Sequence, residues 1–130
     1  TTRGVLEGFA VMQTFEQFSA EEICKLENLV SQMEAAAVRR NNRMVTQVGG
    51  EFHDLLISKS DNVQLLEYTD RLSLKLHTLF NKHWGRLYTP AEIGRRHMAI
   101  VDSLKQKDPL QIELVVRGHY VETGTKIAAL

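Results

Sequence analysis

The sequence predicts an all-α protein, an antiparallel bundle of about six helices. Three observations lead to this expectation. Apolar residues recur every three or four positions through most of the chain, which is the period of a helix with one buried face. No segment alternates apolar and polar residues as a half-buried strand does. Helix-start signals separate the segments at short intervals, which favours antiparallel neighbours. The 130 residues fit a single domain.

Three helices are expected in the first part of the chain, over residues 3–17, 20–40 and 43–58. Ser19 and Glu22 have the spacing of a capping box, in which each side chain bonds the backbone N–H of the other residue. The second segment carries its apolar stripe at helical spacing: Ile23, Leu26, Leu29, Val30 and Met33.

The fourth helix is expected over residues 62–83, with Ser60 or Asp61 as its N-cap. Its leucines recur at helical spacing. Residues 84–89, WGRLYT, are expected to be irregular. His83, close to the predicted end of this helix, is expected to cap its last carbonyl groups.

The last two helices are expected over residues 90–106 and 109–127. The stretch TPAE, residues 89–92, is a capping box with proline at the first helical position, where its missing N–H costs nothing. The stretch DPLQ, residues 108–111, repeats this arrangement with an aspartate as the cap. Both prolines of the chain therefore mark helix starts.

Composition narrows the classes of function. Sixteen basic residues balance sixteen acidic ones, so the domain has no excess of positive charge with which to bind a nucleic acid backbone. The single cysteine, Cys24, excludes an internal disulfide and suits a reducing compartment. No apolar run approaches ~20 residues, so no membrane span is expected. The cytoplasm is the expected location.

Three histidines are expected to face the interior of the bundle. His53, His97 and His119 each continue the apolar stripe of a different predicted helix. Facing side chains converge in a bundle, which is how metal sites are built there. One shared cation would satisfy all three rings, whereas each ring alone can also be a core residue with hydrogen-bonded nitrogens. The spacing leaves both interpretations open, since it is not a contiguous zinc motif.

Several stretches together resemble one known family. FHDLL (52–56), HMAIVDSLKQKDP (97–109) and VVRGHYVETG (115–124) are similar to the FCD domain. This is the C-terminal effector-binding domain of GntR-type bacterial transcription regulators, in their FadR and VanR branches. The resemblance extends to the first two predicted helices and to the start of the fourth. The six predicted helices are nearer to the shorter VanR-type version.

The resemblance implies a central cavity in which three histidines and an Asp or Asn hold a divalent metal. The histidines correspond to His53, His97 and His119, and the acidic ligand should lie four residues before the first of them. That position is Gly49, which has no side chain to donate. Losing the anionic ligand should weaken metal binding and favour zinc or nickel. Alternatively, the cavity is metal-free and the histidines bind the effector directly.

The resemblance also implies a function. The chain is expected to bind a small carboxylate effector, to form a homodimer, and to reach DNA only through an N-terminal winged helix-turn-helix domain that these residues do not contain. A guanidinium group can clamp a carboxylate with two hydrogen bonds. The candidate effector-binding residues are Arg71, Lys75, His77, Arg95, Arg96 and Gln47. Of the adjacent Arg95 and Arg96, at most one can point inward, and long charged side chains are usually solvated.

Two other functions compete with this one. A three-histidine metal with an open position could activate water in a hydrolase. Against this, no Glu or Asp shares a helix face with the histidines to act as a general base, so we expect no enzyme activity. The other alternative is a ligand-free helical dimerisation module. The apolar first helix supports dimerisation weakly, through four residues that can also be core: Phe9, Met12, Phe15 and Phe18.

Overall fold

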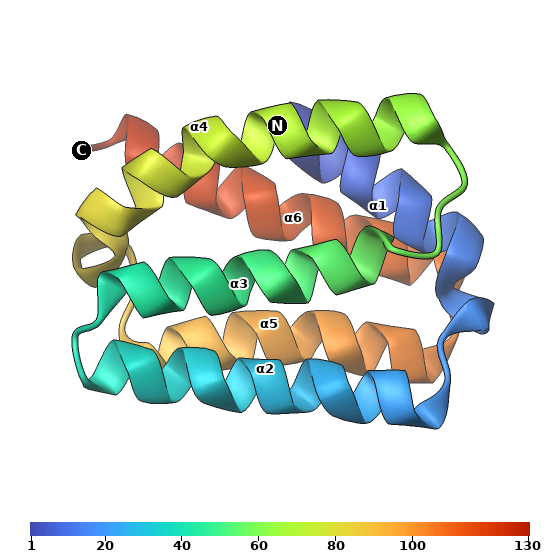
Figure 1. The fold of residues 1–130 in the computed structure, drawn as a ribbon, viewed down its shortest axis with the longest axis horizontal. Coiled ribbons are helices and arrows are strands. Elements are labelled where there is room, and N and C mark those ends of the chain that lie inside the picture. The colour runs from blue at the N-terminus through green and yellow to red at the C-terminus, as the bar shows by residue number, and fades with distance from the viewer.

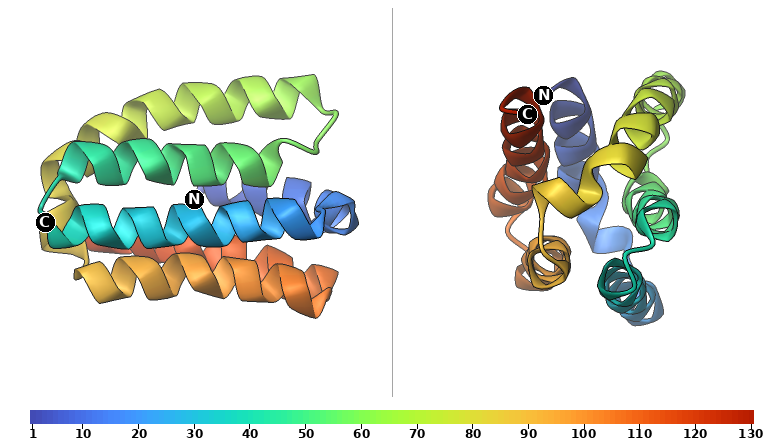
Figure 2. Two further views of the ribbon diagram at one scale, coloured as in Figure 1. Left: turned by 60° about the horizontal axis from the view of Figure 1, so that its bottom comes forward. Right: turned by 90° about the vertical axis from the view of Figure 1, so that its left-hand side faces the viewer.

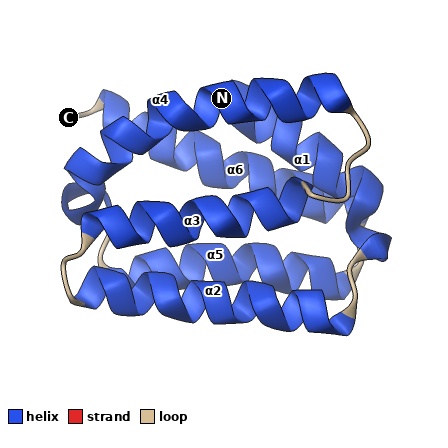
Figure 3. Ribbon diagram, viewed as in Figure 1, coloured by secondary structure: helices blue, strands red, loops and turns tan.

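The computed structural model describes residues 1–130 as six α-helices with no strand, which confirms the predicted fold class (Figure 3). A short 3-10 turn, Phe15–Gln17, follows the first helix. The helices are α1 (Thr2–Thr14), α2 (Ala20–Val38), α3 (Asn42–Ile57), α4 (Val63–Leu87), α5 (Pro90–Gln106) and α6 (Pro109–Ala128).

The helices form a ring in the order α1, α6, α5, α2, α3, α4, and α4 closes the ring by contacting α1 (Figure 1). Each helix runs antiparallel to both neighbours in the ring. Seen along the bundle, the six helices surround a common interior (Figure 2). Side chains from helices far apart in the sequence can therefore meet inside. No helix is both long enough and apolar enough to cross a membrane.

The predicted helix starts agree with the structure at three places. Ser19 and Glu22 form the reciprocal capping box before α2, and Thr89 and Glu92 form the one before α5. The carboxylate of Asp108 accepts hydrogen bonds from the first free backbone N–H groups of α6. Each cap satisfies donors that a helix cannot pair internally, typically contributing about 1 kcal/mol.

The fourth helix differs from its prediction at both ends. It begins after Asn62, whose side chain accepts a hydrogen bond from the N–H of Leu65, so neither predicted cap residue is used. It also continues through residues 84–87, which were expected to be irregular. The reason is tertiary packing, because Trp84 is buried and its Nε1 donates to Thr46 Oγ1 on α3 at 3.0 Å. His83 consequently lies inside the helix and cannot cap its end.

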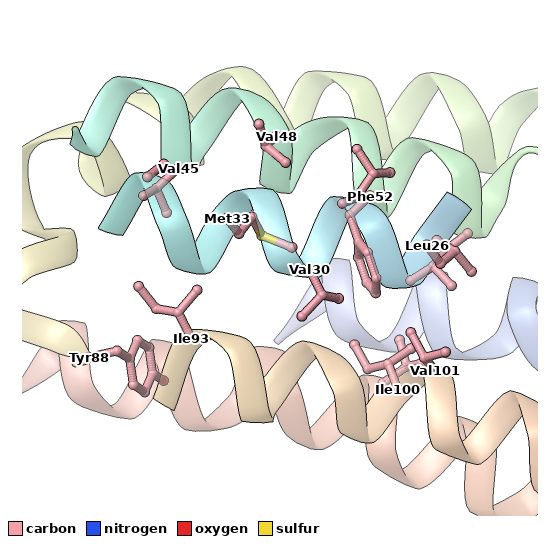
Figure 4. Packing of buried hydrophobic residues seen from close by; sticks show 14 of the residues in the cluster. Leu26, Val30, Met33, Val45, Val48, Phe52, Tyr88, Ile93, Ile100 and Val101 are labelled. Carbon is pink, nitrogen blue, oxygen red and sulfur yellow. The ribbon is translucent and has the colours of Figure 1, made fainter. Parts of the chain in front are cut away.

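The apolar core lies between α2, α3 and α5, with further side chains from the end of α4 and from α6 (Figure 4). Phe52 of α3 is fully buried and points between α2 and α5. Burial of such a side chain contributes roughly 1.5–3 kcal/mol. This packing holds α3 and α5, the helices that carry His53 and His97, at a fixed distance.

Helix α1 approaches α6 unusually closely at two glycines. A Cβ added at Gly4 would lie 2.9 Å from the Cβ of Tyr120, and one added at Gly8 would lie 3.2 Å from the carbonyl oxygen of Glu113. Larger residues at these positions would force the helices apart. The close approach buries the side chains of Arg3 and Glu7, which lie on the same face of α1.

Candidate metal centre

Three histidines meet inside the bundle. His53 comes from α3, His97 from α5 and His119 from α6, and one ring nitrogen of each lies within 4.8 Å of the others. The ring centroids of His97 and His119 are 4.6 Å apart. His97 and His119 are buried, and His53 is partly buried. The predicted convergence of these rings is therefore present in the structure, and it makes the three rings candidate ligands of one shared cation.

Hydrogen bonding fixes the state of His97. Its Nδ1 lies 2.8 Å from the carbonyl oxygen of Ile93, one turn earlier in α5. Because a carbonyl only accepts, Nδ1 carries a proton and Nε2 keeps its lone pair. Burial, and secondarily the neighbouring His53, lowers the pKa of His97 to about 3. The ring is thus neutral at neutral pH, which is the form that binds metals.

His119 has an unsatisfied nitrogen. Its Nδ1 is buried and has no hydrogen-bond partner. Burial, with a smaller effect from His97, lowers the pKa of His119 well below the ordinary value for histidine. A buried unpaired nitrogen costs about 1–3 kcal/mol, so a neutral ring without partners is typical of a site that is completed by a ligand. The donor set therefore fits a metal that prefers nitrogen ligands.

The sequence-based reasoning missed an acidic residue in contact with this cluster. Glu7 of α1 is fully buried, and its Oε1 lies 2.5 Å from His53 Nδ1. Its Oε2 accepts hydrogen bonds from Tyr120 Oη at 2.8 Å and from Arg3 Nε at 3.0 Å. Burial raises the pKa of Glu7, but the combined effect of His53, Arg3 and Tyr120 outweighs it and lowers the pKa. Glu7 is therefore an ionised carboxylate.

Arg3 connects this carboxylate to α4. Its Nη1 donates to the carbonyl oxygen of Thr69 and to Ser73 Oγ, both at 2.5 Å. Burial lowers the pKa of Arg3, but Tyr120 and Glu7 outweigh it and keep the pKa raised. One sequence signal could have identified the pair: Arg3 and Glu7 share an i, i+4 face with the apolar residues that α1 buries.

The cavity beside the histidines is small. Its volume is about 40 Å³, and its lining includes the three rings, Arg3 and Gly49. This volume holds an ion with a few water molecules, whereas sites for organic ligands typically enclose ~300 Å³ or more. Gly49 lines the cavity where the family pattern has an acidic ligand.

Of the six predicted effector-binding residues, one lines this cavity. His77 of α4 does so, and a Cβ added at Gly50 would lie 3.3 Å from its ring. The structure departs from expectation at four others, which are exposed and outside the lining because they lie on outward faces of α3, α4 and α5: Arg71, Lys75, Arg95 and Gln47.

Arg96 is partly buried and Arg95 is exposed, in keeping with the expectation that at most one of the two can point inward. Its Nη2 donates to the carbonyl oxygen of His119 at 2.7 Å and to Thr123 Oγ1 at 2.8 Å. Its guanidinium carbon lies 3.9 Å from the centre of the Tyr88 ring. These contacts hold the Arg96 side chain against α6, where it stabilises the backbone that carries His119.

A larger cavity of about 780 Å³ opens at the end of the bundle, between the end of α2, the end of α4 and the start of α5. The side chain of Trp84 borders both this cavity and the one beside the histidines. The two spaces are therefore neighbours that share one aromatic wall.

Comparison with known proteins gives one match. The family model described as the FCD domain matches residues 1–122 of the chain. No curated protein and no solved structure matches the chain.

Proposed function

The chain belongs to the FCD family, the effector-binding C-terminal domains of GntR-type regulators, and from this premise we propose that it senses a small organic acid through a divalent metal held by His53, His97 and His119. FCD domains are regulatory and not catalytic, so the chain is not an enzyme. The metal would present an open position to the effector, which is the role of metals with three protein ligands.

One observation carries this proposal: three imidazole nitrogens from three separate helices lie within 4.8 Å of one another. Two of the rings have strongly lowered pKa values, so they offer lone pairs without first losing protons. A set of three neutral nitrogen ligands favours zinc or nickel over magnesium or calcium. Gly49 leaves the set without a carboxylate ligand, and this should weaken the affinity for metal.

The charge of the cavity favours an anionic effector. Arg3 and Glu7 offset each other, so a divalent cation held by the histidines would leave the cavity positive. A carboxylate is then the natural ligand. Because a cavity of about 40 Å³ is too small for an organic acid, we infer that it widens when the effector binds.

Helix α4 is the element that can move. Between Thr69 and Trp84 none of its residues is buried, and this stretch covers the cavity with Ser73 and His77. Few buried apolar contacts make local displacement inexpensive. An effector that binds the widened arrangement more tightly shifts the population toward it, by no more than its difference in affinity between the two arrangements.

In this proposal, effector binding changes the affinity for DNA of a separate DNA-binding domain. FCD domains of GntR regulators act as dimers. We propose that this one forms a homodimer in the bacterial cytoplasm and reaches DNA through an N-terminal winged helix-turn-helix domain. Its six helices support a place in the shorter VanR-type branch.

Metal analysis of the purified protein tests the proposal. We expect about one zinc or nickel ion per chain, and its loss in His97→Gln. The control is His83→Gln, which removes a histidine outside the cluster. In the presence of metal, an organic acid at 100 times its Kd should stabilise the protein by about 2.7 kcal/mol. A protein that retains no metal and whose melting temperature no acid changes would instead be a ligand-free dimerisation module.

A further inference from the structure

We propose that Glu7 is a positioning residue of the metal centre. Its hydrogen bond to Nδ1 of His53 holds this imidazole with Nε2 available to a metal, and its charge partly offsets the cation in a site whose ligands are all neutral. This inference rests on the proposed metal site. It adds a residue from α1, a helix that contributes no ligand.

The contact decides the tautomer of His53. Glu7 Oε1 lies 2.5 Å from His53 Nδ1, and the carboxylate can only accept a hydrogen bond. Nδ1 must therefore carry the proton, and Nε2 keeps the lone pair in the neutral ring. Carboxylate–histidine–metal arrangements of this kind are common, because the second partner orients the ring and makes it a stronger donor.

Glu7 is itself held on both sides. Tyr120 Oη and Arg3 Nε both donate to Oε2, which leaves Oε1 for His53. The side chain is fully buried, so water does not compete for the carboxylate. The close approach of α1 to α6 at Gly4 fixes the helix that carries it. The orientation of the carboxylate is therefore set before any metal arrives.

A purely structural role for Glu7 would be to neutralise Arg3. The two roles use different atoms, since Arg3 binds Oε2 and His53 binds Oε1. They can also be separated by Glu7→Gln. Two donors, Tyr120 and Arg3, would keep the amide oxygen of the glutamine on their side. The amide NH2 group would then face His53 Nδ1, which would become an acceptor. The proton would move to Nε2 and block the metal-binding nitrogen.

The first measurement is zinc affinity, by calorimetry against a competing chelator. We expect Glu7→Gln to weaken binding about 10- to 100-fold, the usual effect of removing a partner behind a ligand. The matched control is Glu113→Gln, which makes the same charge change. Glu113 also pairs with an arginine four residues away, Arg117, but hydrogen-bonds no member of the histidine cluster. The control should bind zinc within about twofold of the original protein.

The second measurement needs no metal. Long-range proton–nitrogen NMR of the imidazoles at pH 8 reports which nitrogen carries the proton. We expect Nδ1–H for His53 in the unmodified protein and Nε2–H in Glu7→Gln. The unmodified protein decides this even where the variant fails to fold. A role confined to neutralising Arg3 would not move the proton.

The outcomes separate the two proposals. If the unmodified protein binds no zinc, the metal site is overturned and the role of Glu7 falls with it. If zinc binds but His53 in the metal-free protein is protonated on Nε2 alone, or if Glu7→Gln binds zinc as tightly as Glu113→Gln, the role of Glu7 is overturned and the metal site stands.

Discussion

Replacing Gly49 by aspartate should restore a fourth ligand to the cluster. Gly49 lies one helical turn before His53 and lines the same cavity. A Cβ added there would have one near neighbour, Met33 Sδ, at 3.5 Å, which is an ordinary van der Waals distance. The backbone of Gly49 is helical, with no positive φ. A Cβ at position 49 therefore fits without moving the helix, and position 49 lines the cavity that holds the histidines.

Two effects set the magnitude, and Gly49→Ala separates them. Alanine in place of glycine within a helix stabilises by up to about 1 kcal/mol, which corresponds to about 3 to 5 °C in Tm for a domain of this size. Aspartate in the metal-free protein adds a buried carboxylate, which costs roughly 1–3 kcal/mol. With zinc bound, a charged interaction of about 1.5–3 kcal/mol should tighten binding about 10- to 100-fold.

Calorimetry and thermal melting, each with and without zinc, measure these quantities. We expect Gly49→Ala to melt higher than the original protein with unchanged zinc affinity. Gly49→Asp should melt lower than Gly49→Ala without zinc and bind zinc at least about tenfold more tightly than it. Equal zinc affinities for the two variants would refute the reasoning, because they would mean that a side chain at position 49 does not reach the metal.

Three further predictions follow from the buried charges and from the shared cavity wall. Arg3→Met leaves Glu7 without its cation and should destabilise the protein by about 3–5 kcal/mol in urea unfolding; a loss below about 1 kcal/mol would show that Tyr120 and water suffice. The folded-state pKa of His97 is about 3, below its ordinary value of 6.5, and that of His119 is lowered too. The contribution of His97 to the stability of the metal-free protein is present above pH 6.5 and is lost as the pH falls toward 3, by up to about 1.4 kcal/mol per pH unit, and the contribution of His119 is lost in the same direction; a flat urea-unfolding profile between pH 7.5 and 5 would contradict this. Trp84 is the single tryptophan, so its fluorescence should change when metal and effector bind, and unchanged emission alongside calorimetric binding would argue against widening of the cavity.

The sequence was sufficient for features that depend on local rules. Helix starts at Ser19, Thr89 and Asp108 are set by side chains bonding to nearby backbone groups, and these bonds form within four residues. The inward direction of His53 and His97 follows from helical periodicity, since apolar neighbours on the same stripe define the buried face.

Features that depend on contacts between distant helices were not predicted. The sequence reasoning considered only residues on each histidine's own helix, whereas Glu7 reaches His53 from a different helix, 46 residues away. Its burial requires the close contact that Gly4 and Gly8 permit between α1 and α6, and the sequence does not show which helix lies against these glycines. The end of α4 was missed for a related reason, since burial of Trp84 against α3 extends the helix beyond what its local residues indicate.

The hydrogen bonds of Arg3 connect the start of α1 to the middle of α4. Arg3 lies in the first turn of the helix and donates to Thr69 and Ser73 of α4, and Ser73 lines the cavity beside the histidines. From Arg3 to Thr14 the helix measures about 16 Å, so a sideways shift of about 1 Å at Arg3 tilts its axis by about 4°. FCD domains are C-terminal in their regulators. In a regulator of this family, a displacement of α4 would therefore be transmitted to the first helix of the effector-binding domain.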